Sequence, residues 1–194
     1  MQLKYSFLIA SVLLLNFGCT TTTNSKETRR IALDTTLLIE KVAEDIISEL
    51  NGQVILESGF VDGGDYYIEF HPDTTNADPA DLIKESYTIQ RESIKTGLLN
   101  NDDIYDFAIQ SIWSPVSGNM YGLQWHILTS TDNSWKLIAN SFGGDKFSSI
   151  ENISEIKESK ISTELIEFDE DQFLHSDSTI TRTFILIGDT LTEE

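Results

Sequence analysis

The chain has 194 residues, a single cysteine and a formal net charge of −19, from 32 acidic and 13 basic residues. This acidic balance argues against nucleic acid as a partner and against docking on anionic lipid through a basic patch. A single cysteine cannot form an internal disulfide, so the fold must depend on its hydrophobic core. The length is typical of one domain.

The first 18 residues have the pattern of a secretory signal peptide. Lys4 and the free amino group make the start of the chain positive, and an apolar run follows over residues 5–17. A helix that spans a bilayer needs about 20 apolar residues, so this run is too short for a stable membrane span. We therefore expect residues 1–18 to be a cleaved signal peptide.

The Gly18-Cys19 junction after this run resembles the lipobox of bacterial lipoproteins, although Asn16 stands where that family usually has leucine. The resemblance covers the signal peptide only. It implies cleavage before Cys19, acyl chains on this cysteine, and a place in the cell envelope, with residues 19–30 as lipidated cysteine and flexible tether. Thr20 stands where some bacteria use aspartate to retain lipoproteins in the inner membrane, which favours the outer membrane.

The folded part begins with helical and then strand-like patterns. Apolar residues at four-residue spacing, from Leu38 to Leu50, predict an amphipathic helix over residues 31–50. Asn51-Gly52 has the chemistry of a helix C-terminal cap. Residues 53–61 and 66–70 are rich in β-branched and aromatic side chains, so they predict a β-hairpin.

A second helix is predicted after Asp78-Pro79, because aspartate is a common N-cap and proline is common at the first helical position. Ile83, Tyr87, Gln90 and Ile94 would share one face of this helix, and Gly97 would end it.

Three strands are predicted next, over residues 104–113, 120–129 and 134–142, with polar turns between them. In the middle strand Trp125 shares a face with Tyr121, Leu123 and Ile127, so we expect it in the core beneath the helices. His126 then lies on the opposite, half-exposed face.

The last fifty residues predict a mixture of elements. Residues 150–156 suggest helical turns, 161–168 a strand, 169–178 an acidic loop and 179–187 a strand. The complete order α-β-β-α-β-β-β-x-β predicts an α+β fold with helices on one face of a mostly antiparallel sheet. We expect one domain over residues 31–188 and a frayed tail over residues 189–194.

No cluster in the sequence indicates a reaction. His71, His126 and His175 lack metal-ligand spacing, and no G-x-S-x-G motif of a hydrolase occurs. The three acidic runs, residues 73–78, 101–103 and 169–171, are interpreted as solvated loops. We therefore expect no catalytic residue, no metal site and no cofactor. Three Asp-Ser/Thr sequences resemble the O-glycosylation acceptors of some bacterial phyla; they begin at Asp73, Asp177 and Asp189.

The sequence favours a membrane-tethered module that binds a protein partner. The acidic charge is compatible with a basic partner. An immunity protein against a basic toxin is one version of this hypothesis. Two alternatives stay open: an envelope hydrolase with a dispersed active site, and an accessory subunit of an outer-membrane complex.

Overall fold

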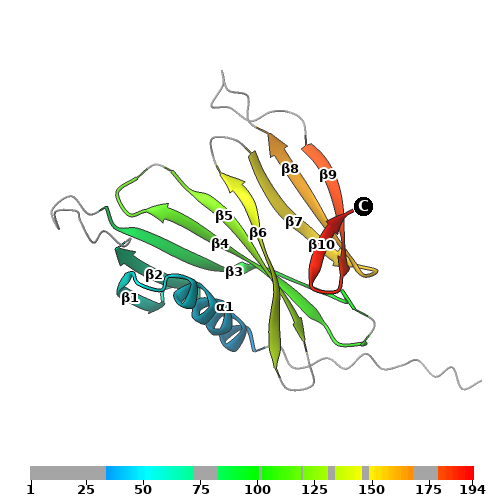
Figure 1. The fold of residues 1–194 in the computed structure, drawn as a ribbon, viewed down its shortest axis with the longest axis horizontal. Helices are drawn as coiled ribbons and strands as arrows, with labels where there is room; N and C mark the ends of the chain where they lie inside the picture. The colour runs from blue at the N-terminus through cyan, green and yellow to red at the C-terminus, as the bar shows by residue number, and fades with distance from the viewer. Residues whose placement is uncertain are drawn as a thin grey trace, which may run out of the picture.

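The computed structural model describes residues 34–71, 83–100, 102–118, 120–130, 134–145, 149–167 and 179–194. These residues form one helix and ten strands (Figure 1). Each strand pairs antiparallel with its neighbours in the chain, so one continuous sheet runs in the order β1 to β10. The elements are α1 (Thr35–Glu49), β1 (Val54–Phe60), β2 (Tyr66–His71), β3 (Glu85–Gly97), β4 (Asp106–Pro115), β5 (Gly122–Ser130), β6 (Trp135–Asp145), β7 (Ser149–Lys157), β8 (Lys160–Glu167), β9 (Thr179–Ile187) and β10 (Thr190–Glu193).

The helix α1 confirms the first predicted element. The Asp34 side chain accepts hydrogen bonds from the backbone N–H groups of Thr36 and Leu37, which caps the helix N-terminus. Gly52 follows the helix with a φ of +90°, the left-handed conformation that glycine adopts without strain. One face of the helix is buried, and it consists of Leu38, Ile39, Val42, Ala43 and Ile46.

The predicted second helix is wrong, because residues 85–97 form the strand β3, which pairs with both β2 and β4. Tyr87 and Ile89 lie two residues apart and both pack toward α1, as a strand requires. The apparent helical spacing to Ile94 arises from an irregularity, since the register with β4 shifts between Gln90 and Lys95. Asp78-Pro79 lies outside the described residues.

Two further segments are strands where the sequence suggested other structure. Residues 149–157 form β7, and both Ile153 and Ile156 face the core because the pairing register with β8 shifts between Ile153 and Glu155. This bulge produces a three-residue spacing that resembles a helical turn. Residues 190–193, predicted as part of a frayed tail, pair with β9 as β10. The coarse fold class, a mostly antiparallel sheet with helix, is confirmed.

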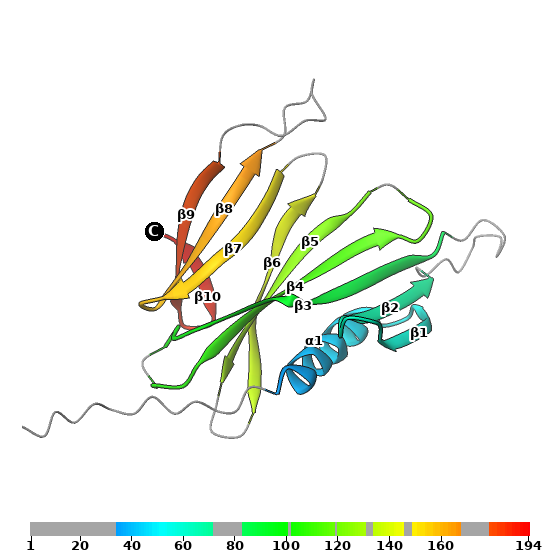
Figure 2. The same cartoon turned by 180° about the vertical axis from the view of Figure 1, so that it is seen from behind.

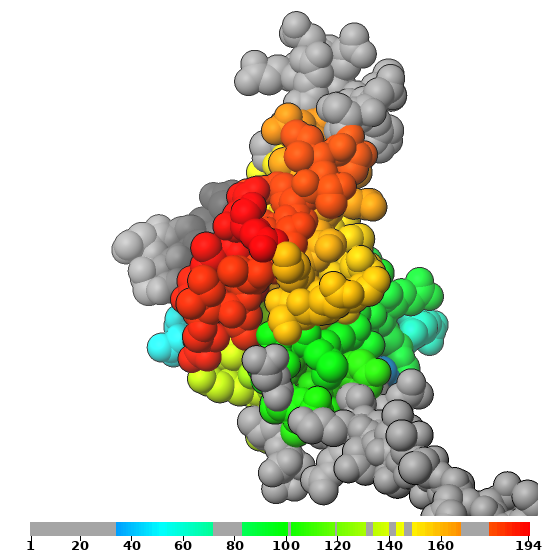
Figure 3. Space-filling view, turned by 90° about the vertical axis from the view of Figure 1, so that its right-hand side faces the viewer, coloured from blue at the N-terminus to red at the C-terminus, as the bar shows by residue number. Residues whose placement is uncertain are grey.

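The sheet folds back on itself between β6 and β7. In the part of the chain that the structure describes, β6 pairs with β7 through Gly144 and Asp145 alone, opposite Ile150 and Ser149, and Gly144 has a φ of +88°. In Figures 1 and 2 the strands β7 to β10 form a second layer beside the larger layer β1 to β6, with α1 on the other side of the larger layer. Figure 3 shows the outer surface of the second layer, with β9 and β10 in orange and red.

The two faces of the larger layer therefore carry two separate cores. The first core joins α1 to strands β2–β5 and includes Ile46, Ile68, Phe70, Ile109 and Leu128. The second core joins β4 and β5 to β7–β10, and it includes Ala108, Trp125, Ile127, Ile153 and Ile161. Strands β4 and β5 are thus covered on both faces.

Candidate functional site

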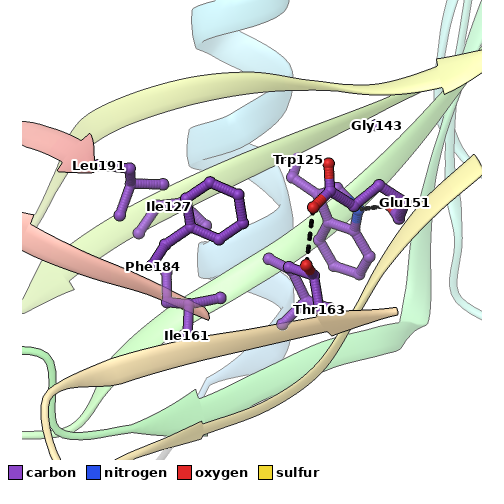
Figure 4. A pocket seen from close by; sticks show the side chains of 9 residues that line it. Trp125, Ile127, Gly143, Glu151, Ile161, Thr163, Phe184 and Leu191 are labelled. Carbon is purple, nitrogen blue, oxygen red and sulfur yellow. Dashed lines mark hydrogen bonds between the residues drawn. The ribbon is translucent and has the colours of Figure 1, made fainter. Parts of the chain in front are cut away.

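A cavity of about 110 Å³ lies between the two layers, inside the second core (Figure 4). Every strand from β5 to β10 contributes to its wall, so the fold-back of the sheet creates it. Most of the wall is apolar; it is formed by Trp125, Ile127, Gly143, Glu151, Ile153, Ile161, Thr163, Phe184 and Leu191. These residues come from six strands, and no local sequence pattern identifies them as a group.

Glu151 forms the polar part of the wall. One oxygen of its carboxylate, Oε1, accepts a hydrogen bond of 2.7 Å from the Thr163 hydroxyl, and Oε2 lies 3.2 Å from Nη1 of Arg182. Its backbone carbonyl accepts a hydrogen bond of 2.8 Å from the indole N–H of Trp125. This last bond joins β5 in the larger layer to β7 in the second layer, beside the cavity.

Arg182 connects this wall to the C-terminal strand. Its guanidinium donates two hydrogen bonds to the Glu193 carboxylate and lies over the Phe184 ring, 5.2 Å from the ring centroid. The hydrogen bond with Glu193, together with the charge of Glu151, raises the pKa of Arg182 above its ordinary value. The same hydrogen bond lowers the pKa of Glu193. Strand β10 is therefore held against the cavity partly by charge.

The predicted burial of Trp125 is confirmed, but the prediction of what covers it is wrong, and His126 is buried as well. Trp125 is 4 % exposed and packs in the second core, so it lies on the face away from α1 rather than beneath the helix. His126 points to the opposite face, as expected from strand alternation, but it is 0 % exposed instead of half-exposed. Strand alternation predicts that the two side chains point to opposite faces of the sheet. It does not predict which element packs on each face.

A hydrolase would need a serine and a histidine in contact at an accessible position. Ser111 and His126 are in contact, but they are not accessible. The Ser111 hydroxyl and Nε2 of His126 are 2.9 Å apart, and both residues are completely buried. A nucleophile must reach its substrate, so this pair fits a structural hydrogen bond within the core.

A buried carboxylate that no sequence motif indicates lies at the start of β4. Asp106 is 0 % exposed and accepts hydrogen bonds from the backbone N–H groups of Leu99, Asn100 and Ser130. Burial raises the pKa of this carboxyl group, while the hydrogen bonds oppose the shift. Asp106 links the β3–β4 connection to the end of β5, and an aspartate at the start of an apolar strand is the signal that could have identified it.

The other predicted positions stay apart or fall outside the described residues. His71 ends β2, while Cys19, His175 and the acidic runs 73–78 and 169–171 are not described. Asp102 accepts a hydrogen bond from the backbone N–H of Ile104, so it shapes the loop before β4. Within the described ranges, no three His, Cys, Asp or Glu side chains are grouped so that they could hold a metal ion. Asp189 lies at the β9–β10 turn.

A surface feature lies at the β1 edge of the sheet. No strand of the described chain pairs with the outer side of β1. Four large apolar side chains are exposed there: Val54 at 60 %, Leu56 at 41 %, Phe60 at 42 % and Val61 at 46 %. The exposed Glu57 lies among them. We call these four residues the β1 apolar edge.

Comparison with known protein families, curated proteins and solved structures finds no match for this chain. The single helix of the described residues is not long and apolar enough to cross a membrane.

Proposed function

We propose that this protein is a lipid-anchored module of the cell envelope that binds another protein. The β1 apolar edge is the observation that supports binding. Single exposed apolar residues are common on soluble proteins, but these four lie within eight residues, in β1 and directly after it. No described strand covers the outer side of β1, which favours an interaction site. A protein partner would cover these side chains and add backbone hydrogen bonds along the strand.

The charge around the edge favours a basic partner. Glu57 is at the middle of β1, Asp62 and Asp65 flank the turn that follows, and the whole chain has a net charge of −19. If two copies paired antiparallel about the middle of β1, the Glu57 side chains would face each other, which is unfavourable. A strand with lysine or arginine opposite Glu57 would pair favourably, and it would be attracted from a distance by the acidic surface.

The anchor in this proposal is Cys19, after removal of residues 1–18, with an outer-membrane location favoured by Thr20. Stable anchoring requires more than one acyl chain, and a triacylated cysteine provides it. A toxin-neutralising role is one form of the proposal, because a basic toxin would have the required charge.

The anchor and the partner can be tested separately. Cys19→Ser should move the protein from the membrane fraction to the soluble fraction, and a mutant that stays with the membrane after a high-salt wash would refute the anchor. For the partner, a photo-crosslinking amino acid at Leu56 should give a discrete adduct in cells. The same amino acid at Ile187, which is 60 % exposed on β9, serves as the control.

We expect mass spectrometry to identify one basic protein in the Leu56 adduct, and Glu57→Lys to reduce the yield of that adduct. An adduct of two copies of this chain, or equal labelling from Leu56 and Ile187, would contradict the proposal.

A further inference from the structure

We propose that the cavity between the two layers binds one small neutral molecule with a ring-sized apolar body and a hydrogen-bond donor, of the phenol type. This site is separate from the β1 apolar edge, which lies on a strand that takes no part in the cavity wall.

The size and the apolar wall define the body of the ligand. A cavity of about 150 Å³ lined by aliphatic and aromatic side chains stays dry and binds benzene, so the volume of about 110 Å³ suits a single ring or a short chain. Six of the nine wall residues are apolar and larger than alanine, and Phe184 and Trp125 provide aromatic surfaces (Figure 4). An acyl chain of membrane-lipid length exceeds this space.

Glu151 defines the polar group of the ligand. Among the wall residues that the structure describes it is the only charged one, and its side chain is 16 % exposed. Each carboxylate oxygen can accept two hydrogen bonds, while Thr163 and Arg182 each occupy one position. A ligand hydroxyl can therefore donate to Glu151, whereas a ligand carboxylate would place a second negative charge beside it.

Strand β10 provides a route into the cavity. Leu191 closes one side of the wall from this four-residue strand, which pairs only with β9 among the described strands. The strand and its turn are held by exposed ion pairs, Lys136 with Asp189, Lys160 with Glu194 and Arg182 with Glu193. Exposed ion pairs are weak individually and screened by salt, so β10 can separate locally from β9, taking Leu191 out of the wall, while α1 and strands β2–β8 stay packed.

The competing explanation is an imperfectly packed core with no ligand, and three probes distinguish it from a binding site. The whole chain carrying Cys19→Ser is titrated with phenol, toluene or benzoate, and the indole N–H resonance of Trp125 is followed by NMR. We expect a saturable shift with phenol, with a Kd of about 0.1–10 mM for a ligand of this size. Toluene should bind several-fold more weakly, and benzoate at least ten-fold more weakly than phenol.

Two matched variants test the location. Leu191→Trp should fill the cavity and abolish the phenol-induced shift, whereas Ile187→Trp, on the exposed end of β9, should preserve it. Circular dichroism checks that both variants fold. If Leu191→Trp does not fold, Leu191→Ala provides the second test, because a more open wall should accelerate phenol exchange.

The absence of a saturable shift with phenol and toluene would overturn the proposal, as would unchanged binding in Leu191→Trp. Equal affinity for phenol and benzoate would overturn the role of Glu151. None of these outcomes affects the partner site at β1, which the crosslinking experiment tests independently.

Discussion

The Ser111 hydroxyl and Nε2 of His126 form a hydrogen bond of 2.9 Å in the interior, where neither residue is accessible to solvent. The two residues lie on the neighbouring strands β4 and β5, in a layer that α1 covers on one face and β7–β9 on the other. A polar side chain buried in this way must find a partner, because an unpaired buried donor or acceptor costs about 1–3 kcal/mol.

We predict that His126→Ala destabilises the protein by about 2–4 kcal/mol. The mutation leaves a cavity and removes the partner of Ser111, so the two costs add. The free energy of unfolding from chemical denaturation measures the loss. Thr129→Ala, at a half-buried position of the same strand, is the control and should cost much less. Similar losses in both variants would mean that the ring is not enclosed.

Trp125 should couple energetically to the second layer and not to the helix. Trp125→Phe is combined with Ile161→Val in β8, or with Ile39→Val in α1; both isoleucines are buried. Residues that share a cavity show coupling of about 0.5–3 kcal/mol, whereas residues without shared partners add within about 0.5 kcal/mol. We therefore expect non-additivity only with Ile161→Val, measured by denaturation of the single and double mutants. Coupling with Ile39→Val alone would place Trp125 under α1.

The pH dependence of stability should carry a contribution from Asp106. Its pKa is raised in the folded protein, mainly by burial, so the folded state binds the proton more tightly than the unfolded state. This contribution is fully present below the ordinary pKa of 3.8 and is lost as the pH rises through the raised folded value.

Asp106→Asn replaces the carboxyl group by an amide that does not titrate. We expect the unfolding free energy of the wild type, relative to that of Asp106→Asn, to increase as the pH falls toward 3.8. At neutral pH the variant should itself be less stable by about 1–3 kcal/mol, because its amide nitrogen would face backbone N–H donors instead of accepting from them. A stability difference that does not change with pH would contradict the raised pKa.

Gly144 should be essential for the corner between β6 and β7. A Cβ atom at this position would lie 1.9 Å from the Ser149 carbonyl oxygen, and the φ of +88° is unfavourable for other residues. We expect Gly144→Ala to lower the thermal midpoint strongly or to prevent folding. Gly59→Ala, where nothing lies within 4 Å of the added Cβ, should change the midpoint little. Thermal circular dichroism of both variants checks this contrast.

The elements that the sequence predicts correctly are those specified by local patterns. The four-residue spacing and the Asn51-Gly52 stop predict α1, and β-branched residues around the 62–65 turn predict the first hairpin. Strands β4, β5 and β6 follow from runs of apolar residues between polar turns. In each case the information lies within about twenty residues, because it concerns one periodicity and its ends.

The two strands that the sequence predicted as helix, β3 and β7, share one physical cause. In a regular strand, residues on the same face are an even number of positions apart. In β3 and β7 a shift of pairing register breaks this rule, so Ile94 and Ile156 face the core at spacings that resemble those of a helix. Such a shift is defined by the partner strand and not by the bulged strand alone. Strand pairing on both sides of β3 then overrides the helical appearance of its sequence.

The sequence by itself determined that Trp125 and His126 point to opposite faces of a strand, since alternation is a property of the extended backbone. Only the tertiary structure decided that both faces are covered. The helix packs on the His126 side and the strands β7–β9 on the Trp125 side, because the sheet turns back at Gly144. The cavity arises from the same fold-back, since it brings together side chains from six strands that are separated by up to 66 positions in the chain, from Trp125 to Leu191. No local pattern in the sequence predicts that residues so far apart along the chain come together.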